Sequence, residues 1–314
     1  MSDFIFSLNA TMPVFLLMLL GWCFGKIGML TDEFVRVSNK FVFKVALPVL
    51  LFKDIASANI NDVFDIRFLL FCMISTTVCF FGIWGAARLL MKDKSMIGAF
   101  VQGSFRGSAA ILGVAFIQNM YGNSGMAPLM IIGAVPLFNI YSVIVLTIEG
   151  SNSDGKGIRS AFLNILKNPI ILGILVGMIG SLVHIYDYLP AIIEKTAGNL
   201  ASIASPLALL AIGAGFEGGK AIKKAKPTII ASFLKLIGLP LIFMPIAIAL
   251  GFRNHDLIAF LIMLGAPTTV TSYIMAANMN NDGILASGIV VLTTLLSAVT
   301  LTTWIFILRV MGMI

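Results

Sequence analysis

Two stretches of sequence decide the fold of this chain: Gln102-Gly-Ser-Phe-Arg-Gly-Ser-Ala-Ala-Ile-Leu-Gly113 and Met263-Leu-Gly-Ala-Pro-Thr-Thr-Val-Thr-Ser-Tyr273. Each lies inside an apolar segment, and each carries glycine, proline or hydroxyl residues that interrupt a helix. Lipid tolerates an interrupted helix only where the freed backbone groups face protein or a water-filled cavity. Paired interruptions at corresponding positions of two halves are typical of the substrate site of a transporter.

The composition indicates a polytopic all-α membrane protein. Hydrophobic residues make up 59% of the 314 residues, charged residues only 11%, and the mean hydropathy is +1.02. A soluble domain carries about 25% charged residues. The net charge of +7 comes from short loops, so nucleic acid is not an expected partner, and the lipid bilayer is. The three cysteines lie in apolar stretches without a metal-binding spacing, and we expect neither a metal nor a cofactor.

The apolar runs predict ten transmembrane helices. The expected segments are 4–25, 34–56, 66–90, 96–120, 126–148, 162–185, 190–216, 227–250, 255–279 and 284–309. The second is the least secure, because Lys40 and Lys44 interrupt it. With the N-terminus outside, the inner loops hold twelve Lys and Arg residues and the outer loops and tail hold five. The positive-inside rule therefore predicts a multi-pass protein of the cytoplasmic membrane with both termini outside.

The two halves of the chain repeat. Pro13 and Gly21 in the first segment match Pro169 and Gly177 in the sixth, and the members of each pair are eight positions apart. Five segments in each repeat is an odd number, so the second repeat must insert upside down, as in many secondary transporters. The predicted organisation is a first five-helix repeat at 1–148, a short cytoplasmic linker at 149–160 and a second inverted repeat at 161–314.

The charges deep inside the predicted membrane segments are all basic. They are Lys40, Lys44, Arg106 and Lys235, whereas the acidic residues fall at segment ends or in loops. A positive interior favours an anionic substrate, because intramembrane charges usually face a cavity or the interior of the bundle. The alternative is structural: Lys40 and Lys235 extend to the interface, and Lys44 pairs with a carboxylate such as Asp54. Arg106 could bind a carboxylate or satisfy carbonyls freed at the break.

The substrate site is predicted at the two interruptions. Half-helices that start after a break direct amide N–H groups and the positive end of a dipole toward the membrane centre, which suits an anion. The candidate substrate-binding residues are Arg106, Gly107, Ser108, Asn139, Pro267, Thr268, Thr269 and Ser272. The candidates for a cation or supporting site are Gln102, Gln118 and Lys44. The structural alternative is a pair of kinks packed in protein, with hydroxyls bonded to nearby carbonyls.

These residues together resemble the auxin efflux carrier family of PIN-like permeases, which includes bacterial malate and malonate permease-like members. The resemblance covers essentially the whole chain. The resemblance rests on the motifs Ala46-Leu-Pro-Val-Leu-Leu-Phe52, Phe105-Arg-Gly-Ser108, Pro136-Leu-Phe-Asn139, Asn168-Pro169 and Ala266-Pro-Thr-Thr-Val-Thr-Ser-Tyr-Ile-Met-Ala276. The resemblance implies ten helices in an inverted repeat, with helices 4 and 9 broken and crossing beside the substrate. It also implies a scaffold domain and a transport domain that moves like an elevator, commonly in a homodimer.

The chain departs from the family pattern in the first crossing. Family members usually have asparagine at the position of Ser108, proline at that of Ala115, and often an acidic residue near Gln118. The central loop is about a dozen residues here, although it is long in many plant carriers. These differences favour a small organic anion over auxin itself.

The sequence predicts a secondary transporter of a small carboxylate that works by alternating access. The second hypothesis is a sodium- or proton-coupled symporter of bile-acid-symporter-like architecture, with Gln102, Gln118 and backbone carbonyls at the cation site. An intramembrane enzyme is disfavoured because no Asp pair or buried His lies at one depth. A membrane sensor would normally carry a soluble output domain, and we expect none in this chain.

Overall fold

The computed structural model describes residues 2–57, 65–109, 117, 120–121, 125–150, 166–216 and 218–314. Every regular element within these ranges is helical, which confirms the predicted all-α polytopic class. Five described helices are long and apolar enough to cross a membrane: Ile66–Leu90, Ala127–Ile148, Ala191–Ala214, Ala225–Ala249 and Gly283–Val310.

The described helices of the first half follow the predicted segments closely. The second predicted segment forms a continuous helix despite its two lysines, and Thr31 caps its start by accepting a hydrogen bond from the Phe34 amide at 3.2 Å. Asp65 caps the third helix through the Arg67 amide at 2.7 Å. The elements are α1 (Ser2–Lys26), α2 (Asp32–Phe41), η1 (Val42–Ala46), α3 (Leu47–Ala56), α4 (Ile66–Leu90), η2 (Lys94–Met96), α5 (Ile97–Phe105) and α7 (Ala127–Ile148).

The second half contains more short helices than the sequence predicted. The sixth segment was expected from 162 to 185, but its described helix begins at Pro169, where Asn168 accepts a hydrogen bond from the Ile170 amide at 2.9 Å. The elements are α9 (Pro169–Leu182), α10 (Ile185–Tyr188), α11 (Ala191–Ala214), α12 (Gly218–Lys223), α13 (Ala225–Phe233), η3 (Leu234–Gly238), α14 (Leu239–Ala249), α15 (His255–Gly265), α16 (Thr271–Asn278) and α17 (Gly283–Val310).

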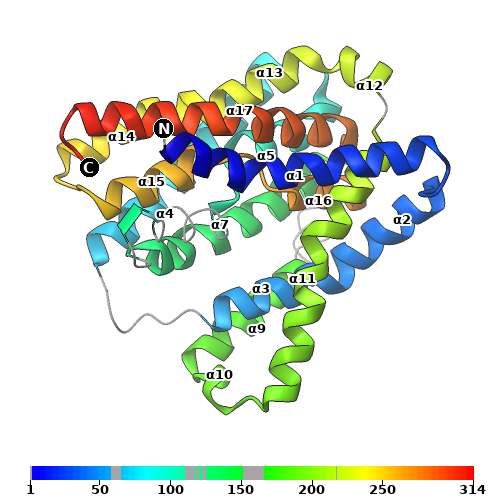
Figure 1. The fold of residues 1–314 in the computed structure, drawn as a ribbon, viewed down its shortest axis with the longest axis horizontal. Helices are drawn as coiled ribbons and strands as arrows, with labels where there is room; N and C mark the ends of the chain where they lie inside the picture. Colours follow the sequence, from blue (N-terminus) through cyan, green and yellow to red (C-terminus); the bar gives the residue numbers. More distant parts are fainter. Residues whose placement is uncertain are drawn as a thin grey trace.

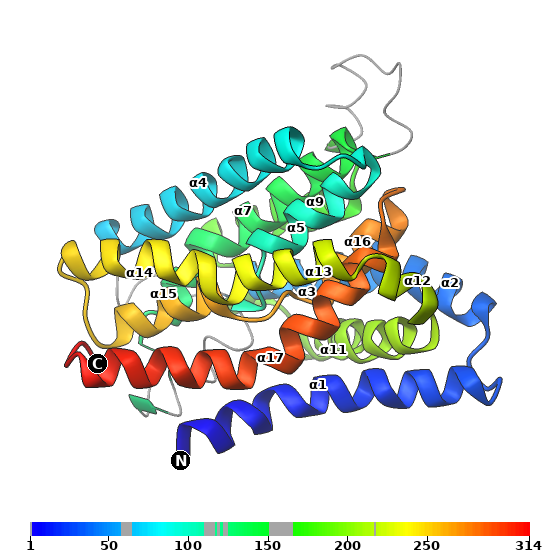
Figure 2. The ribbon, with the colours of Figure 1, turned by 90° about the horizontal axis from the view of Figure 1, so that it is seen from above.

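Most of the long helices run roughly along one direction, as Figures 1 and 2 show. The two chain ends lie toward the same end of this bundle in both views. Two wide helical turns of the π type, η1 and η3, interrupt otherwise regular helices, and each immediately precedes a Leu-Pro pair. Such turns insert an extra residue and are common at functional sites.

Small residues bring the helices of one group into close contact. In this group α1 packs against α11, and α3 packs against both α9 and α11. A Cβ atom at Gly213 would overlap the carbonyl of Met18, and one at Gly173 would lie 2.6 Å from the carbonyl oxygen of Pro48. The small residues of α11 thus allow close helix packing.

A second group of helices surrounds the interrupted segments. Here α4 packs against α5 and α7, and α13 packs against α17. Phe68 on α4 stacks on Phe260 on α15 with ring centroids 4.4 Å apart, so the two halves of the chain share one aromatic core. All nine residues of α5 are buried, which places the first interruption inside the protein rather than in lipid.

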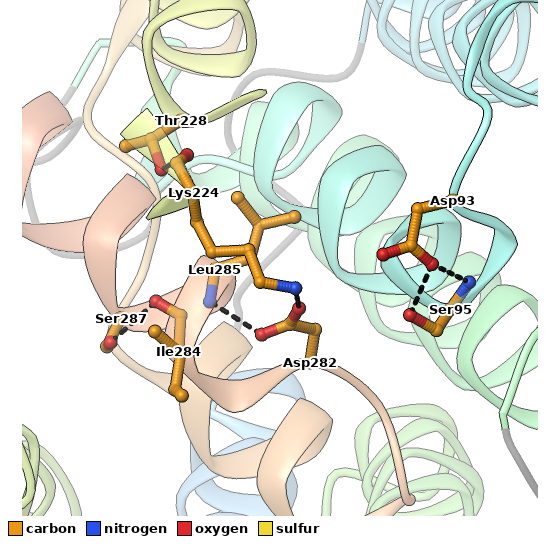
Figure 3. A network of polar contacts seen from close by, with 8 residues as sticks. All are labelled: Asp93, Ser95, Lys224, Thr228, Asp282, Ile284, Leu285 and Ser287. Carbon is orange, nitrogen blue, oxygen red and sulfur yellow. Dashed lines mark hydrogen bonds and ion pairs between the residues drawn. The ribbon is translucent and has the colours of Figure 1, made fainter. Parts of the chain in front are cut away.

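Polar contacts join several helix ends at one end of the bundle (Figure 3). Lys224 binds Asp282 at 2.6 Å, and the same carboxylate caps α17 by accepting a hydrogen bond from the Leu285 amide at 2.9 Å. Asp93 accepts hydrogen bonds from the hydroxyl and amide of Ser95, and these hold the pKa of Asp93 below its usual range. The ion pair thus joins the start of α13 to the start of α17, whereas Asp93 bonds within its own turn.

Candidate functional site

The two interruptions meet as the sequence predicted. Helix α5 ends at Phe105, and Arg106 is extended with φ −86° and ψ 127°. Helix α15 ends at Gly265, and Ala266 is extended with φ −67° and ψ 154°, as expected for a residue before proline. The amide of Ser108 donates a hydrogen bond of 2.9 Å to the carbonyl oxygen of Pro267, so the two breaks are bonded to each other.

Buried hydrogen bonds from Thr268 stabilise this crossing. Its hydroxyl donates to the carbonyl oxygen of Gly103 at 2.6 Å, and its amide donates to the hydroxyl of Thr293 at 3.1 Å. These bonds satisfy a carbonyl near the end of α5 that has no partner within its own helix. The Thr268 side chain is therefore used to hold the crossing together.

Lys235 is buried against the two helix ends that meet at the crossing. Its side chain is 0% exposed, and its Nζ donates hydrogen bonds to the carbonyl oxygens of Leu264 at 2.7 Å, Met263 at 3.1 Å and Phe105 at 3.3 Å. The expectation that Lys235 extends to the membrane interface is wrong. The wide turn η3 directs its side chain toward the ends of α5 and α15 instead.

A small cavity of about 60 Å³ opens beside the crossing. Its volume suits a few water molecules or a small ligand group. The cavity lies between the first helix group, represented by α3 and α11, and the crossing with α7. Its lining residues are Leu50, Leu51, Asp54, Arg106, Gly107, Ser108, Ala109, Val135, Phe138, Asn139, Ser205, Thr269 and Thr271.

Arg106 is the buried charge of this cavity. It is 5% exposed, and its guanidinium donates to Asn139 Oδ1 at 2.7 Å and to Met275 Sδ at 2.7 Å. Asn139 in turn donates to the carbonyl oxygen of Val135 at 2.8 Å. Among the residues that the structure describes, no carboxylate forms an ion pair with Arg106. Two contacts use only part of the five N–H donors of a guanidinium.

The structure brings together five of the eight residues predicted to bind substrate. Arg106, Gly107, Ser108, Asn139 and Thr269 line the cavity. The remaining three belong to the crossing but do not line the cavity: Pro267, Thr268 and Ser272. The hydroxyl oxygen of Ser272 is buried without a hydrogen-bond partner.

Two of the three candidates for a cation or supporting site, Gln102 and Lys44, are described, and neither lines the cavity. Gln102 is fully buried, and its Nε2 donates to Met275 Sδ at 3.4 Å while its Oε1 has no partner. Lys44 is exposed, and it forms no ion pair with Asp54, so that expected pair is wrong. Ten residues of helix separate the two along the axis by about 15 Å. Gln118 lies outside the described residues, as does Ala115.

Sequence reasoning missed two polar residues of the cavity, Asp54 and Ser205, and did not include a third, the break-adjacent Thr271, among the substrate-binding candidates. Asp54 was assigned to the end of a segment, yet it lines the same cavity as Arg106. A signal for it exists in the helical spacing, because Leu50, Leu51 and Asp54 lie on one face of α3. Sequence alone does not tell which face meets the crossing.

Comparison with known proteins identifies the family to which this chain belongs. The model of a family described as "Membrane transport protein" matches residues 6–305, which is nearly the whole chain. This family comprises the auxin efflux carriers and PIN-like permeases, as the resemblance indicated.

Three relatives match along almost their full lengths. "Uncharacterized transporter YfdV" of Escherichia coli (strain K12) is 27% identical over 98% of this chain and 99% of its own. "Uncharacterized transporter" of Methanothermobacter thermautotrophicus is 24% identical over 97% and 99%. "Putative malonate transporter" of Rhizobium meliloti is 24% identical over 95% and 94%. The family and these relatives are transporters rather than enzymes, and this chain belongs to the membrane transport protein family of auxin efflux carrier-like permeases.

Proposed function

We propose that this protein is a secondary transporter that moves a small carboxylate across the cytoplasmic membrane by alternating access. The observation that carries the proposal is Arg106, a buried guanidinium that lines the cavity with only neutral partners. A buried charge without a counter-ion is costly. A carboxylate substrate would supply that counter-charge and could bind the planar guanidinium through two parallel hydrogen bonds.

Polar groups around Arg106 suit the orientation of a carboxylate. The hydroxyls of Ser108, Thr269 and Thr271 line the same cavity. Helix α16 starts at Thr271, so the positive end of its dipole lies beside the cavity lining. In our proposal Arg106 attracts the anion and the hydroxyls orient it, while Gly107 and Pro267 shape the crossing.

Malonate is the first substrate to test. One relative that spans nearly the whole chain carries the name "Putative malonate transporter". The cavity volume of about 60 Å³ favours a ligand of a few heavy atoms over an aromatic one. Short mono- and dicarboxylates are therefore the substrate class that we propose.

The movement that we propose is an elevator motion of the second helix group against the first. Two broken helices at corresponding positions and the matched prolines of the two halves support an inverted repeat of ten helices. The proposal retains the repeats at 1–148 and 161–314, both termini outside and a homodimer. Cysteine accessibility at the two chain ends would test the orientation.

The test of the substrate class is a thermal-shift titration of the purified protein with malonate. Ligand that binds only the folded state raises its stability by RT ln(1 + [L]/Kd). We expect a saturable upward shift in the wild type. Loss of a charge-assisted hydrogen bond costs about 1.5–3 kcal/mol, so Arg106→Gln should weaken malonate binding by about 10- to 150-fold.

Arg67→Gln is the matched control for this experiment. Arg67 is exposed and lies at the start of α4, away from the cavity lining. Its replacement removes one positive charge from the protein but should leave the malonate shift intact. If Arg106→Gln folds and still binds malonate as the wild type does, the proposed site is wrong.

A second candidate function is proton-coupled symport of the same anion. Asp54 lines the cavity together with Arg106, although the two do not form an ion pair. A carboxylate in this place repels an anionic substrate, and protonation of Asp54 would remove the repulsion. Intramembrane carboxylates commonly carry protons in transporters.

Uptake into proteoliposomes separates the two candidates. Under proton coupling, an inwardly directed proton gradient should accelerate malonate uptake by the wild type, and Asp54→Asn should abolish that acceleration. Ser205→Ala changes another polar residue of the cavity and should preserve the response. If the proton gradient does not change the rate of malonate uptake by the wild type at constant membrane potential, the uncoupled carrier is favoured.

A further inference from the structure

We propose that the ammonium group of Lys235 is a built-in cation that occupies the place of a coupling sodium ion at the crossing, so that transport requires no sodium. This inference rests on the proposed transport function, and it concerns the sodium branch of the symport hypothesis. Lys235 does not line the cavity, so its role differs from that of Arg106.

The contacts of Lys235 resemble the coordination of a bound cation. Three carbonyl oxygens surround its Nζ: Leu264 at 2.7 Å, Met263 at 3.1 Å and Phe105 at 3.3 Å. A neutral amine has only two N–H donors, whereas an ammonium has three. The geometry therefore matches the charged form of the side chain.

The charge of the site also matches one cation. Phe105 is the last residue of α5, and Met263 and Leu264 belong to the last turn of α15. Each helix C-terminus carries about half a negative charge, so two together carry about one. Among the residues that the structure describes, no carboxylate is paired with Lys235. The two helix ends are thus its counter-charge.

The protein leaves space for this side chain and closes it off from solvent. A Cβ atom at Gly107 would lie 2.9 Å from Lys235 Nζ, so a larger residue there would displace the ammonium. The ring centroid of Phe138, which lines the cavity, lies 5.9 Å from Lys235 Nζ. Lys235 is 0% exposed, and water cannot replace its bonds to the three carbonyls.

Carbonyl oxygens at half-helix C-termini are the groups that hold sodium in coupled transporters with broken helices. Here the same type of groups is already occupied by a covalently attached cation. A tethered ammonium cannot dissociate into the cytoplasm, so it cannot couple transport to a sodium gradient. Its role is to hold the ends of α5 and α15 together through the transport cycle.

The first test measures how the wild type responds to monovalent cations. Thermal unfolding of the purified protein should have the same midpoint in sodium, potassium and choline chloride at equal ionic strength. Malonate uptake into proteoliposomes should be the same in sodium and in choline, with a change below about twofold. A sodium-specific rise in the unfolding midpoint or a sodium requirement for uptake would overturn the proposal.

The second test removes the tethered cation and offers a free one. Lys235→Ala should lower the unfolding midpoint, and methylammonium or sodium should restore part of it, whereas choline, which is too large for the vacated space, should not. Lys44→Met is the matched control, because Lys44 is exposed in the other π-type turn, and it should show no cation-specific rescue. If small cations do not restore Lys235→Ala, the proposal is wrong.

Lys235→Met keeps the test decisive if the alanine variant does not fold. Methionine fills similar space without a charge, so we expect the Lys235→Met protein to have an unfolding midpoint well below that of the wild type. A Lys235→Met protein as stable as the wild type would show that no cation is needed there. The thermal shift with malonate is a separate measurement. If the wild type shows no malonate shift and no response to sodium, the proposed substrate is wrong, but the proposed role of Lys235 is not contradicted.

Discussion

Lys44 and Lys235 lie in the same kind of local structure, but one side chain is exposed and the other is buried. Each lies in a five-residue π-type turn, η1 or η3, that immediately precedes a Leu-Pro pair in an apolar helix. Lys44 is exposed, whereas Lys235 is 0% exposed and bonded to three carbonyls. The difference indicates that the burial of a lysine in an apolar helix depends on the neighbouring helices and not on the local structure of its own helix.

The neighbours differ in their backbone polarity. Lys235 faces the ends of two interrupted helices, whose last carbonyls lack partners within their own helices. Lys44 is exposed, and no hydrogen bond or ion pair from its side chain is found among the residues that the structure describes. A buried cation is tolerated only where such acceptors offset the loss of water.

The largest expected effect tests the comparison directly. Lys235→Met should lower the free energy of unfolding by about 3–5 kcal/mol, because three buried carbonyls lose their donor. Lys44→Met should change it by less than about 0.5 kcal/mol, because the lysine is exposed. Thermal or denaturant unfolding in detergent measures both. Similar losses for the two variants would break the comparison.

The second effect concerns the space that Lys235 needs. Gly107→Ala should destabilise the protein by about 1–3 kcal/mol, because the new Cβ would lie 2.9 Å from Lys235 Nζ and 3.3 Å from the carbonyl oxygen of Met263. Gly82→Ala is the control, since nothing lies within 4 Å of its added Cβ, and it should be neutral or stabilising. Equal unfolding midpoints for the two variants would argue against a closely fitted ammonium site.

The third effect concerns the turn that directs Lys235. Trp304 on α17 donates from Nε1 to the carbonyl oxygen of Leu236 within η3 at 3.1 Å. Trp304→Phe removes this bond and should cost about 1 kcal/mol. Trp22→Phe, at an exposed site on α1, provides the comparison and should cost less. The unfolding midpoints of the two variants, measured side by side, decide the point.

The smallest effect concerns a lysine at a helix end. Lys224 pairs with Asp282 at 2.6 Å and is partly exposed (Figure 3). Lys224→Gln should cost less than about 1 kcal/mol, and the cost should shrink at high salt because such pairs are screened. Stability measured at low and high ionic strength tests this. A cost as large as that of Lys235→Met would show that burial does not set the order of effects.

Much of the fold could be predicted from local sequence. Pro267 with the residue before it predicts the end of α15, and the observed extended Ala266 confirms that prediction. The small residues of α11 suit its close packing, as the approach of Gly213 to the Met18 carbonyl shows. These features depend on neighbours along the chain or on residue size, so sequence carries them directly.

The candidate site could be predicted only in part. Arg106 and Ser108 were found because they adjoin a visible break. Asp54 was missed because its helix does not reveal which face meets the crossing. Thr268 lies at the break, but its hydroxyl donates a hydrogen bond to the Gly103 carbonyl oxygen. No local sequence rule distinguishes this structural bond from a bond to substrate.

By itself, the sequence determined that this protein is an all-helical membrane transporter with two interrupted segments, because hydropathy, proline and glycine act locally. Only the tertiary structure decided which charges serve the site. It joined Arg106 to Asn139 in a cavity and bonded Lys235 to carbonyls of two distant helix ends. The physical reason is that a buried charge is stabilised by acceptors that the fold brings to it from elsewhere in the chain.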